Sequence, residues 1–128
     1  MFREISGEEY WVMDISYSGS VLDVDGKSFI FPFDIGQVIT DGEYVFVRLD
    51  LPMEKKYRHE STNIYGIRDG KVIWQNEDPH LVYQYDYCPF EGIYFEDGKL
   101  AASDFYSLRV VFSKETGKVE GELPTGRW

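Results

Sequence analysis

The sequence predicts a single all-β domain, built as an antiparallel meander of three similar units. Short runs of alternating, β-branched and aromatic residues fill the chain, and no stretch keeps a helical period for three turns. Asp-Gly and Thr-Gly pairs separate these runs, and Asp-Gly is a strong hairpin signal. With 128 residues, 43% hydrophobic and 17% aromatic, the chain has the size and composition of one globular domain, spanning 1–128.

A strand is predicted at 43–51, where β-branched and aromatic residues cluster around Phe46. The best helix candidate, 52–60, is polar and allows no more than one or two turns. Hairpin turns are predicted where both central positions can take positive φ. One set of turns, Asp25-Gly26, Asp69-Gly70 and Thr116-Gly117, follows one strand and opens another. A second set, at 7–10, Asp41-Gly42 and Asp97-Gly98, precedes the strongest strand of each unit.

An internal repeat organises the strands. Residues 32–43 align with 89–99 across one gap, and both read Pro-Phe-acid, glycine, a short apolar strand and Asp-Gly. We expect Phe33 and Phe90 to take matching buried positions in the two copies. A third, truncated copy begins at Ile5. The predicted units span about 5–33, 34–87 and 88–122, the middle one with insertions at 52–61 and 76–87.

The order of strand, Asp-Gly or Thr-Gly turn, lysine and valine resembles the blades of quinoprotein-type β-propellers. Residues 64–74 and 111–119 carry this resemblance, although Trp74 has no counterpart in the third unit. No quinone site is carried over. A closed propeller needs four to eight blades. Three units are therefore expected to curl into a small barrel, sandwich or propeller-like sheet as a monomer; the alternative is a ring completed by several chains.

The formal net charge of −10 excludes some partners. Phosphate backbones and anionic membrane surfaces repel such a chain, so we expect no nucleic acid and no membrane as partner. A cationic protein fits the charge, and so does solubility alone. The sequence begins with no apolar targeting segment, has no membrane-spanning run, and holds one cysteine, Cys88, all of which favour the cytoplasm.

No catalytic motif is present, so we expect no enzyme, no metal and no cofactor. His59, His80 and Cys88 lack the close spacing of structural zinc ligands, which indicates two solvated loop histidines and a packing cysteine. The segment 23–26 lacks the ligand spacing of a calcium loop and is a hairpin turn. Phosphate-binding glycine loops and nucleophile elbows are absent from the sequence.

Two sets of residues are candidates for partner binding. Tyr83, Tyr85 and Tyr87 alternate, so a strand would place them on one face as a binding platform, the alternative being core packing. The second set consists of acids in equivalent turns, which should gather at one rim of the sheet. These acids are Asp41, Glu43, Glu96 and Asp97.

These features favour a non-enzymatic protein-interaction module. One concrete version is an immunity-type protein that neutralises a cationic toxin through an acidic face. The alternative is a small-molecule or glycan binder that uses an aromatic-lined cleft between repeat units. The basic loop 53–60, unusual in an acidic chain, either solvates a turn or marks a docking site for an acidic partner or a second subunit.

Overall fold

The computed structural model of the chain describes residues 2–5, 8–11, 13–79, 88–105 and 108–123, with side chains for 13–79, 88–105 and 108–120. These residues form strands joined by short turns, and their helical part is one 3-10 turn, η1 (Lys55–Tyr57), inside the predicted loop. The strands are β1 (Phe2–Ile5), β2 (Glu8–Trp11), β3 (Ile15–Ser18), β4 (Val21–Val24), β5 (Lys27–Ile30), β6 (Asp34–Thr40), β7 (Val45–Asp50), β8 (Ile64–Arg68), β9 (Lys71–Gln75), β10 (Phe90–Glu96), β11 (Lys99–Asp104), β12 (Arg109–Phe112) and β13 (Val119–Leu123). The all-β prediction is confirmed.

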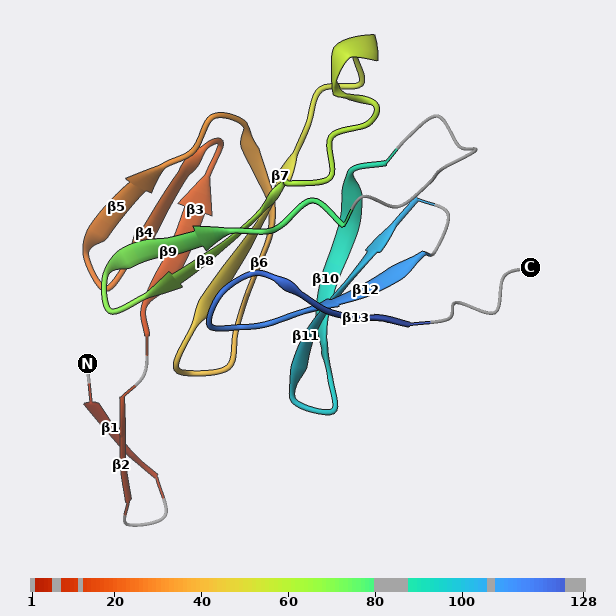
Figure 1. The fold of residues 1–128 in the computed structure, drawn as a ribbon. Helices are drawn as coiled ribbons and strands as arrows, with labels where there is room; N and C mark the ends of the chain where they lie inside the picture. The colour runs from red at the N-terminus through yellow and green to blue at the C-terminus, as the bar shows by residue number, and fades with distance from the viewer. Residues whose placement is uncertain (1, 6–7, 12, 80–87, 106–107, 124–128) are drawn as a thin grey trace.

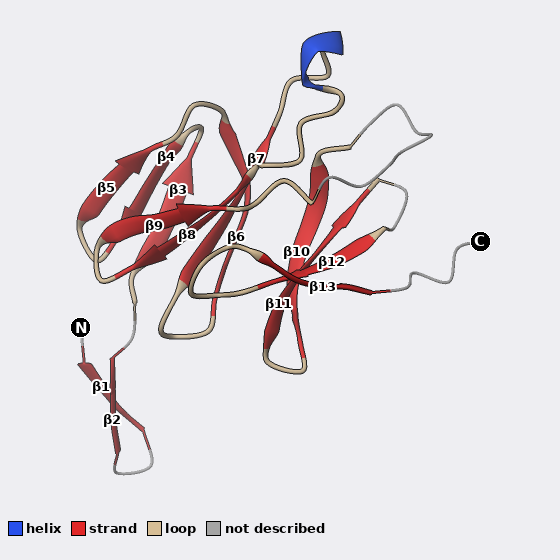
Figure 2. Ribbon diagram, in the orientation of Figure 1, coloured by secondary structure: helices blue, strands red, loops and turns tan. Residues whose placement is uncertain are grey.

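The strands form antiparallel sheets in chain order (Figures 1 and 2). β1 and β2 make an N-terminal hairpin; β3–β5 make the first sheet, β6–β9 the second and β10–β13 the third. The described strands do not close into a barrel. A long meander must curl or split to bury its faces, and this one splits, because β5 does not pair with β6, nor β9 with β10.

The hairpin turns are those that the sequence predicts. Asp25, Asp69 and Asp97 have φ values of 50°, 51° and 51°, and the glycine after each also has positive φ. Two successive residues of this kind match the twist of the flanking strands. The sequence signal for these three turns is therefore confirmed at the level of the backbone. At Asp41-Gly42 and Thr116-Gly117 the glycine alone has positive φ, so these two turns differ from the predicted type.

The second sheet lies between the other two, and its strand β7 is buried on both faces. Alternate residues of a strand point to opposite faces. Val45, Val47 and Leu49 accordingly belong to a core cluster with residues of the first sheet, and Phe46 belongs to a second cluster with residues of the third sheet. β6 lies against β3 and β4, and β10 lies against β6 and β7 in the same way.

The β6–β7 and β10–β11 hairpins share a bulge at the same place in their register. In the first hairpin it follows the Ile35–Leu49 pair, and in the second it follows the pair formed by Phe90 with Asp104. The register therefore equates Phe90 with Ile35 and not with Phe33. The prediction of matching buried phenylalanines is wrong: Phe90 is buried, whereas Phe33 is half-buried. Both hairpins contain the bulge; they differ in the number of paired residues between bulge and turn, which is four at 37–40 and five at 92–96. This difference shifts the frame of the alignment.

Candidate functional site

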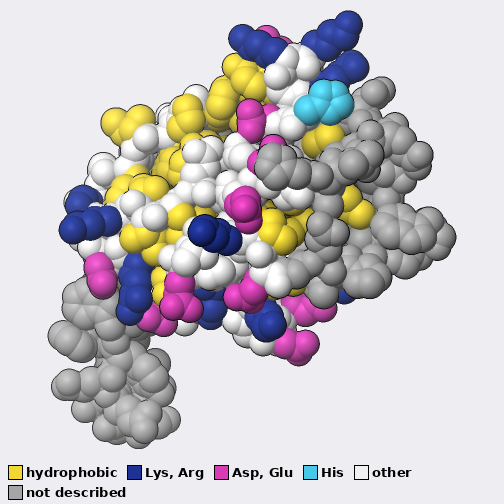
Figure 3. Space-filling model, viewed as in Figure 1, with side chains coloured by type: hydrophobic (Ala, Val, Ile, Leu, Met, Phe, Trp, Pro, Cys, Tyr) yellow, Lys and Arg dark blue, Asp and Glu magenta, His cyan; other side chains and the backbone are white. Residues whose placement is uncertain are grey.

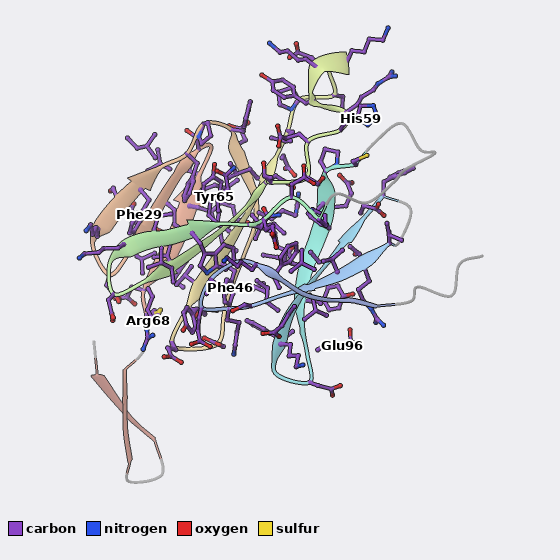
Figure 4. The ribbon with its side chains drawn as sticks, viewed as in Figure 1. Phe29, Phe46, His59, Tyr65, Arg68 and Glu96 are labelled. Atoms are coloured by element: carbon purple, nitrogen blue, oxygen red, sulfur yellow. The ribbon has the colours of Figure 1, made fainter. Side chains whose placement is uncertain are left out.

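Several hairpin turns lie along one margin of the stacked sheets, which runs from the left edge to the bottom of the sheets in Figure 1. We call this margin the rim and define it by the turns 25–26, 41–43, 69–70 and 97–98, which join β4 to β5, β6 to β7, β8 to β9 and β10 to β11. Acidic and basic side chains are interspersed along it in Figure 3. Figure 4 places Arg68 and Glu96 toward this margin and His59 at the opposite one.

A pocket of about 460 Å³ opens at the rim between the first and second sheets. Its apolar part comes from Val24, Val45 and Ile67, which reach it from β4, β7 and β8, together with Met13. Among the described residues that line it, none is aromatic, so this cleft between units differs from the aromatic-lined one expected. Its polar border consists of Asp25, Glu43, Arg68 and Asp69, beside Gly42 and Gly70.

The border holds its own ion pairs. Arg68 Nη2 lies 2.7 Å from a carboxylate oxygen of Glu43, and Arg68 Nε lies 3.8 Å from one of Asp69. The Arg68 guanidinium also stacks 5.2 Å from the centre of the Tyr44 ring. The side chain of a second cation, Lys27, lies close to Gly70 in the turn 69–70. The pocket therefore joins an aliphatic floor to a border of three carboxylates and two nearby cations.

Of the four acids predicted for the rim, Asp41, Glu43 and Asp97 lie in its turns and Glu96 ends β10 beside one of them. Three of the four already have cationic partners. Asp41 pairs with Lys114 at 2.8 Å, Glu43 with Arg68, and Glu96 with Arg109 at 2.9 Å. Asp97 is exposed at the tip of its turn. The sequence located these acids; it could not show their partners, because Asp41 and Lys114 lie 73 residues apart.

Asp41 is held in its charged form by several donors. Burial alone would raise the pKa of this carboxyl, but the hydrogen bond from Lys114, those from the backbone N–H groups of Tyr44 and Glu43, and the charge of Lys114 lower it below 3.8. The hydrogen bond to Asp41 in turn raises the pKa of Lys114 above 10.5. This acid therefore joins the second sheet to the third. Because its carboxylate is paired with Lys114, it contributes little electrostatic field in the surrounding solvent.

The model of one protein family matches residues 12–122, and its description is a domain of unknown function, DUF7957. The chain belongs to the DUF7957 family. No curated protein and no solved structure matches the chain. The matched range begins after β2, so the three stacked sheets make up the DUF7957 domain and the N-terminal hairpin lies outside it. Across the parts of the chain that the structure describes, no helix has the length and apolar character needed to cross a membrane.

The tyrosine platform of the DUF7957 domain, Tyr83, Tyr85 and Tyr87, lies outside the described residues, as does His80. It stays a prediction. The basic loop is described, and it projects from the end opposite the rim (Figure 1). Its residues Lys55, Lys56 and Arg58 are exposed, and Met53 beside them is 82% exposed.

Sequence reasoning missed one pair of chemically active side chains. His59 Nδ1 lies 3.6 Å from Cys88 Sγ, and the backbone N–H of Cys88 donates to the Arg58 carbonyl at 2.6 Å. Cys88 is buried, and this burial, with the negative charges of Asp104 and Asp78, raises the pKa of its thiol. A protonated thiol is a poor nucleophile. Within the described residues, no group of three His, Cys, Asp or Glu side chains could hold a metal ion.

Proposed function

We propose that this DUF7957 domain is a non-catalytic interaction module that binds a cationic protein at the rim. The observation that carries the proposal is the rim pocket, which combines an aliphatic floor with carboxylates at its mouth. A lysine or arginine side chain has this same division, because its stem is apolar and only its tip is charged. The stem would contact Val24, Val45 and Ile67 while the tip approaches the border acids.

The exposed acids at the border of the pocket also favour a lysine or arginine side chain as the ligand. Asp69 is 88% exposed, and Glu43 is 55% exposed even with Arg68 bound to it. A cationic guest would approach Asp69 and compete with Arg68 for Glu43. Because the rim also carries cations, salt should weaken association less than the net charge of −10 suggests. One form of this function is an immunity-type protein that neutralises a cationic toxin.

A second candidate function rests on the size of the same pocket. A volume of about 460 Å³ suits a small ligand, since ligand pockets measure roughly 300–1,000 Å³. The aliphatic floor favours a small amine with an apolar body over a glycan, because sugar rings stack on aromatic side chains. A free amine and a lysine-containing peptide can be compared directly in one binding assay.

The test is a titration of the full chain with oligolysine, followed by NMR of the methyl groups of Val24, Val45 and Ile67. We expect these methyl signals to shift together and the affinity to fall with added salt. The double variant Asp25→Asn and Asp69→Asn should lower the affinity at low salt by about tenfold, if each charge contributes about 0.7 kcal/mol. Oligoglutamate should leave the methyl signals unchanged.

The matched control is the double variant Asp34→Asn and Glu91→Gln. It removes the same net charge from exposed acids at the starts of β6 and β10, away from the rim. Its affinity should equal that of the unmodified chain. Equal loss in both double variants, or binding that leaves the three methyl groups unaffected, would refute the rim pocket as the site.

A further inference from the structure

The first sheet ends at an open strand edge. It contains β3, β4 and β5, whereas the second and third sheets each have a fourth strand, β9 or β13. Among the described residues β5 pairs with β4 alone, so its other side presents backbone groups without a strand partner. An exposed edge of this kind is a template for a strand from another chain.

The hydrogen-bond pattern shows which amides face the open edge. The N–H group of Phe31 donates to the Ser20 carbonyl, on the β4 side, at 2.9 Å. Backbone groups alternate in direction along an antiparallel strand. Those of Ser28 and Ile30 therefore point away from β4, and these two residues offer the donors and acceptors that an added strand needs.

Exposed apolar side chains border this edge. Ile30 on β5 is 80% exposed, and Val72 and Ile73 on β9 are 44% and 42% exposed. The turn that begins β9 lies close to β5, because the Lys27 side chain comes within 3.5 Å of the position that a Cβ would take at Gly70. The surface beside the open edge is therefore apolar and incompletely covered.

The same surface carries two cations that the rest of the domain does not neutralise. Lys27 begins β5 and Lys71 begins β9, and both are exposed. Neither forms an ion pair with any described residue. Outside the basic loop, five of the six other described Lys and Arg residues form ion pairs with described residues, and exposed Lys118 does not. The five are Arg48, Arg68, Lys99, Arg109 and Lys114. An acidic segment therefore suits the open edge.

The N-terminal hairpin has the complementary composition. β1 and β2 pair with each other, and the hairpin stands away from the three sheets (Figure 1). A two-stranded hairpin alone is at best marginally stable in water. The two strands together hold three glutamates, one arginine and four large apolar residues: Glu4, Glu8, Glu9, Arg3, Phe2, Ile5, Tyr10 and Trp11.

We propose that the N-terminal hairpin of a second copy adds to β5, and that two chains exchange hairpins in this way to form a symmetric dimer. The added strand takes backbone hydrogen bonds from Ser28 and Ile30, as in β-strand addition. Its glutamates approach Lys27 and Lys71. Each chain is both donor and acceptor, so the assembly closes at two copies. The sequence had favoured a monomer. This inference rests on the open edge of β5 and not on the rim pocket, although Lys27 borders both surfaces.

The test compares the mass of the full chain with that of edge variants by sedimentation equilibrium. Ile30→Pro removes an outward N–H while leaving the β4 ladder intact. The pair Lys27→Glu and Lys71→Glu reverses the two charges and should raise the dimer dissociation constant by at least about tenfold. The control is Lys55→Glu with Lys56→Glu, an equal change of charge on the basic loop, which should leave the dimer unchanged. Thermal melting by circular dichroism checks that every variant folds.

Hydrogen exchange provides a second readout that does not depend on a variant. The amides of Ser28 and Ile30 should be protected in the dimer and exchange freely after dilution to monomer. A full chain that stays monomeric up to its solubility limit would overturn the proposal. So would a dimer that both edge variants leave intact, or protection of these two amides that is independent of concentration. The last result would mean that the hairpin folds back on its own chain.

Discussion

The two interfaces of the second sheet are built from different side chains. The interface with the first sheet is mainly aliphatic in its buried part, and it includes one ring pair, Phe31 with Tyr65 at 5.0 Å. Its buried residues are Leu22, Val24, Phe31, Ile35, Val45, Val47, Leu49 and Ile67. The interface with the third sheet is largely aromatic. Across it, Phe46 of β7 meets Phe95 of β10 edge-on at 5.9 Å between ring centres. Phe46 also lies 5.8 Å from Trp74 within the second sheet, and Phe90 meets Phe112 edge-on at 5.6 Å within the third. Aromatic pairs of this kind have a preferred geometry, which aliphatic contacts lack.

Buried amides add directional bonds to the aromatic interface. Gln37 accepts from the N–H of Ile93 at 2.9 Å and donates to its carbonyl at 2.7 Å. Asn63 accepts from the N–H of Phe90 at 3.1 Å and donates to the carbonyls of Phe90 and Leu49 at 2.9 Å. The aliphatic interface has a backbone bond from Ile35 to the Gly19 carbonyl. Side-chain amides therefore fix the third sheet in one position, whereas the first sheet is held mainly by burial of apolar area.

Trp74 adds to the difference between the two interfaces of the second sheet. Its ring lies over Gly66 of its own sheet and Gly117 of the third sheet, where an added Cβ would come within 2.3 and 2.5 Å of it. The indole N–H donates to the carbonyl of Lys114 at 2.8 Å. The fourth strand of the second sheet thus covers a turn of the third. The first sheet has no fourth strand among the described residues to cover the second in the same way.

The largest effect should come from the aromatic interface. Phe46→Ala should lower the free energy of unfolding by about 3–5 kcal/mol, because a fully buried ring leaves a cavity. Chemical denaturation measures this loss. Ile30→Ala, at an exposed position of the first sheet, should change the same free energy by less than about 0.5 kcal/mol. A loss below about 1 kcal/mol for Phe46→Ala would mean that the two sheets do not pack through this ring.

The amide contacts can be removed separately from the apolar ones. Asn63→Ala leaves the N–H of Phe90 without its acceptor and removes one donor from each of two carbonyls, and a buried group left unsatisfied costs about 1–3 kcal/mol. We expect a loss of about 2–4 kcal/mol in the free energy of unfolding. Gln75→Ala is the control, since its amide donates to the Thr62 carbonyl at an exposed site. Equal losses in the two variants would remove the distinction between the interfaces.

The smallest effect should come from the Asp41–Lys114 ion pair, which joins the second and third sheets at the rim. Asp41→Asn should lower the free energy of unfolding by about 0.5–1 kcal/mol at neutral pH. The pKa of Asp41 is lower in the folded chain than in the unfolded one, so its contribution is complete above about pH 5 and is lost as the pH falls through the folded value. Denaturation at a series of pH values should show a shallower acid loss in the variant. An equal slope in both proteins would contradict this assignment.

The sequence predicted what local chemistry determines. Alternating residues and Asp-Gly turns were enough for the strands and for the positive φ values of Asp25, Asp69 and Asp97. They were not enough for the split into separate sheets, because strand pairing that stops after β5 and β9 leaves no local signal. The equivalence of Phe90 with Ile35, and not with Phe33, likewise follows from how two strands pair, because the two hairpins differ in the number of pairs between bulge and turn.

Some features of the candidate site could likewise be predicted from the sequence, and others could not. The rim acids could be located, since turn positions follow from sequence spacing. Their neutralisation by Lys114, Arg68 and Arg109 could not, since these partners come from other strands and turns. The aliphatic lining of the pocket also depends on which faces of two sheets meet. Long-range contacts therefore decide the properties of the site that matter most for binding.

Native-state hydrogen exchange tests most directly whether the second sheet forms the packing surface that the first and third sheets share. The amides of β7, buried on both faces, should exchange only through global unfolding. Those of β11 should open at a lower free energy, and those of β4 at the lowest, because the first sheet lacks the amide bonds and the tryptophan contact. Exchange from β4 that requires the same free energy as β7, or exchange from β7 that precedes β11, would contradict this account.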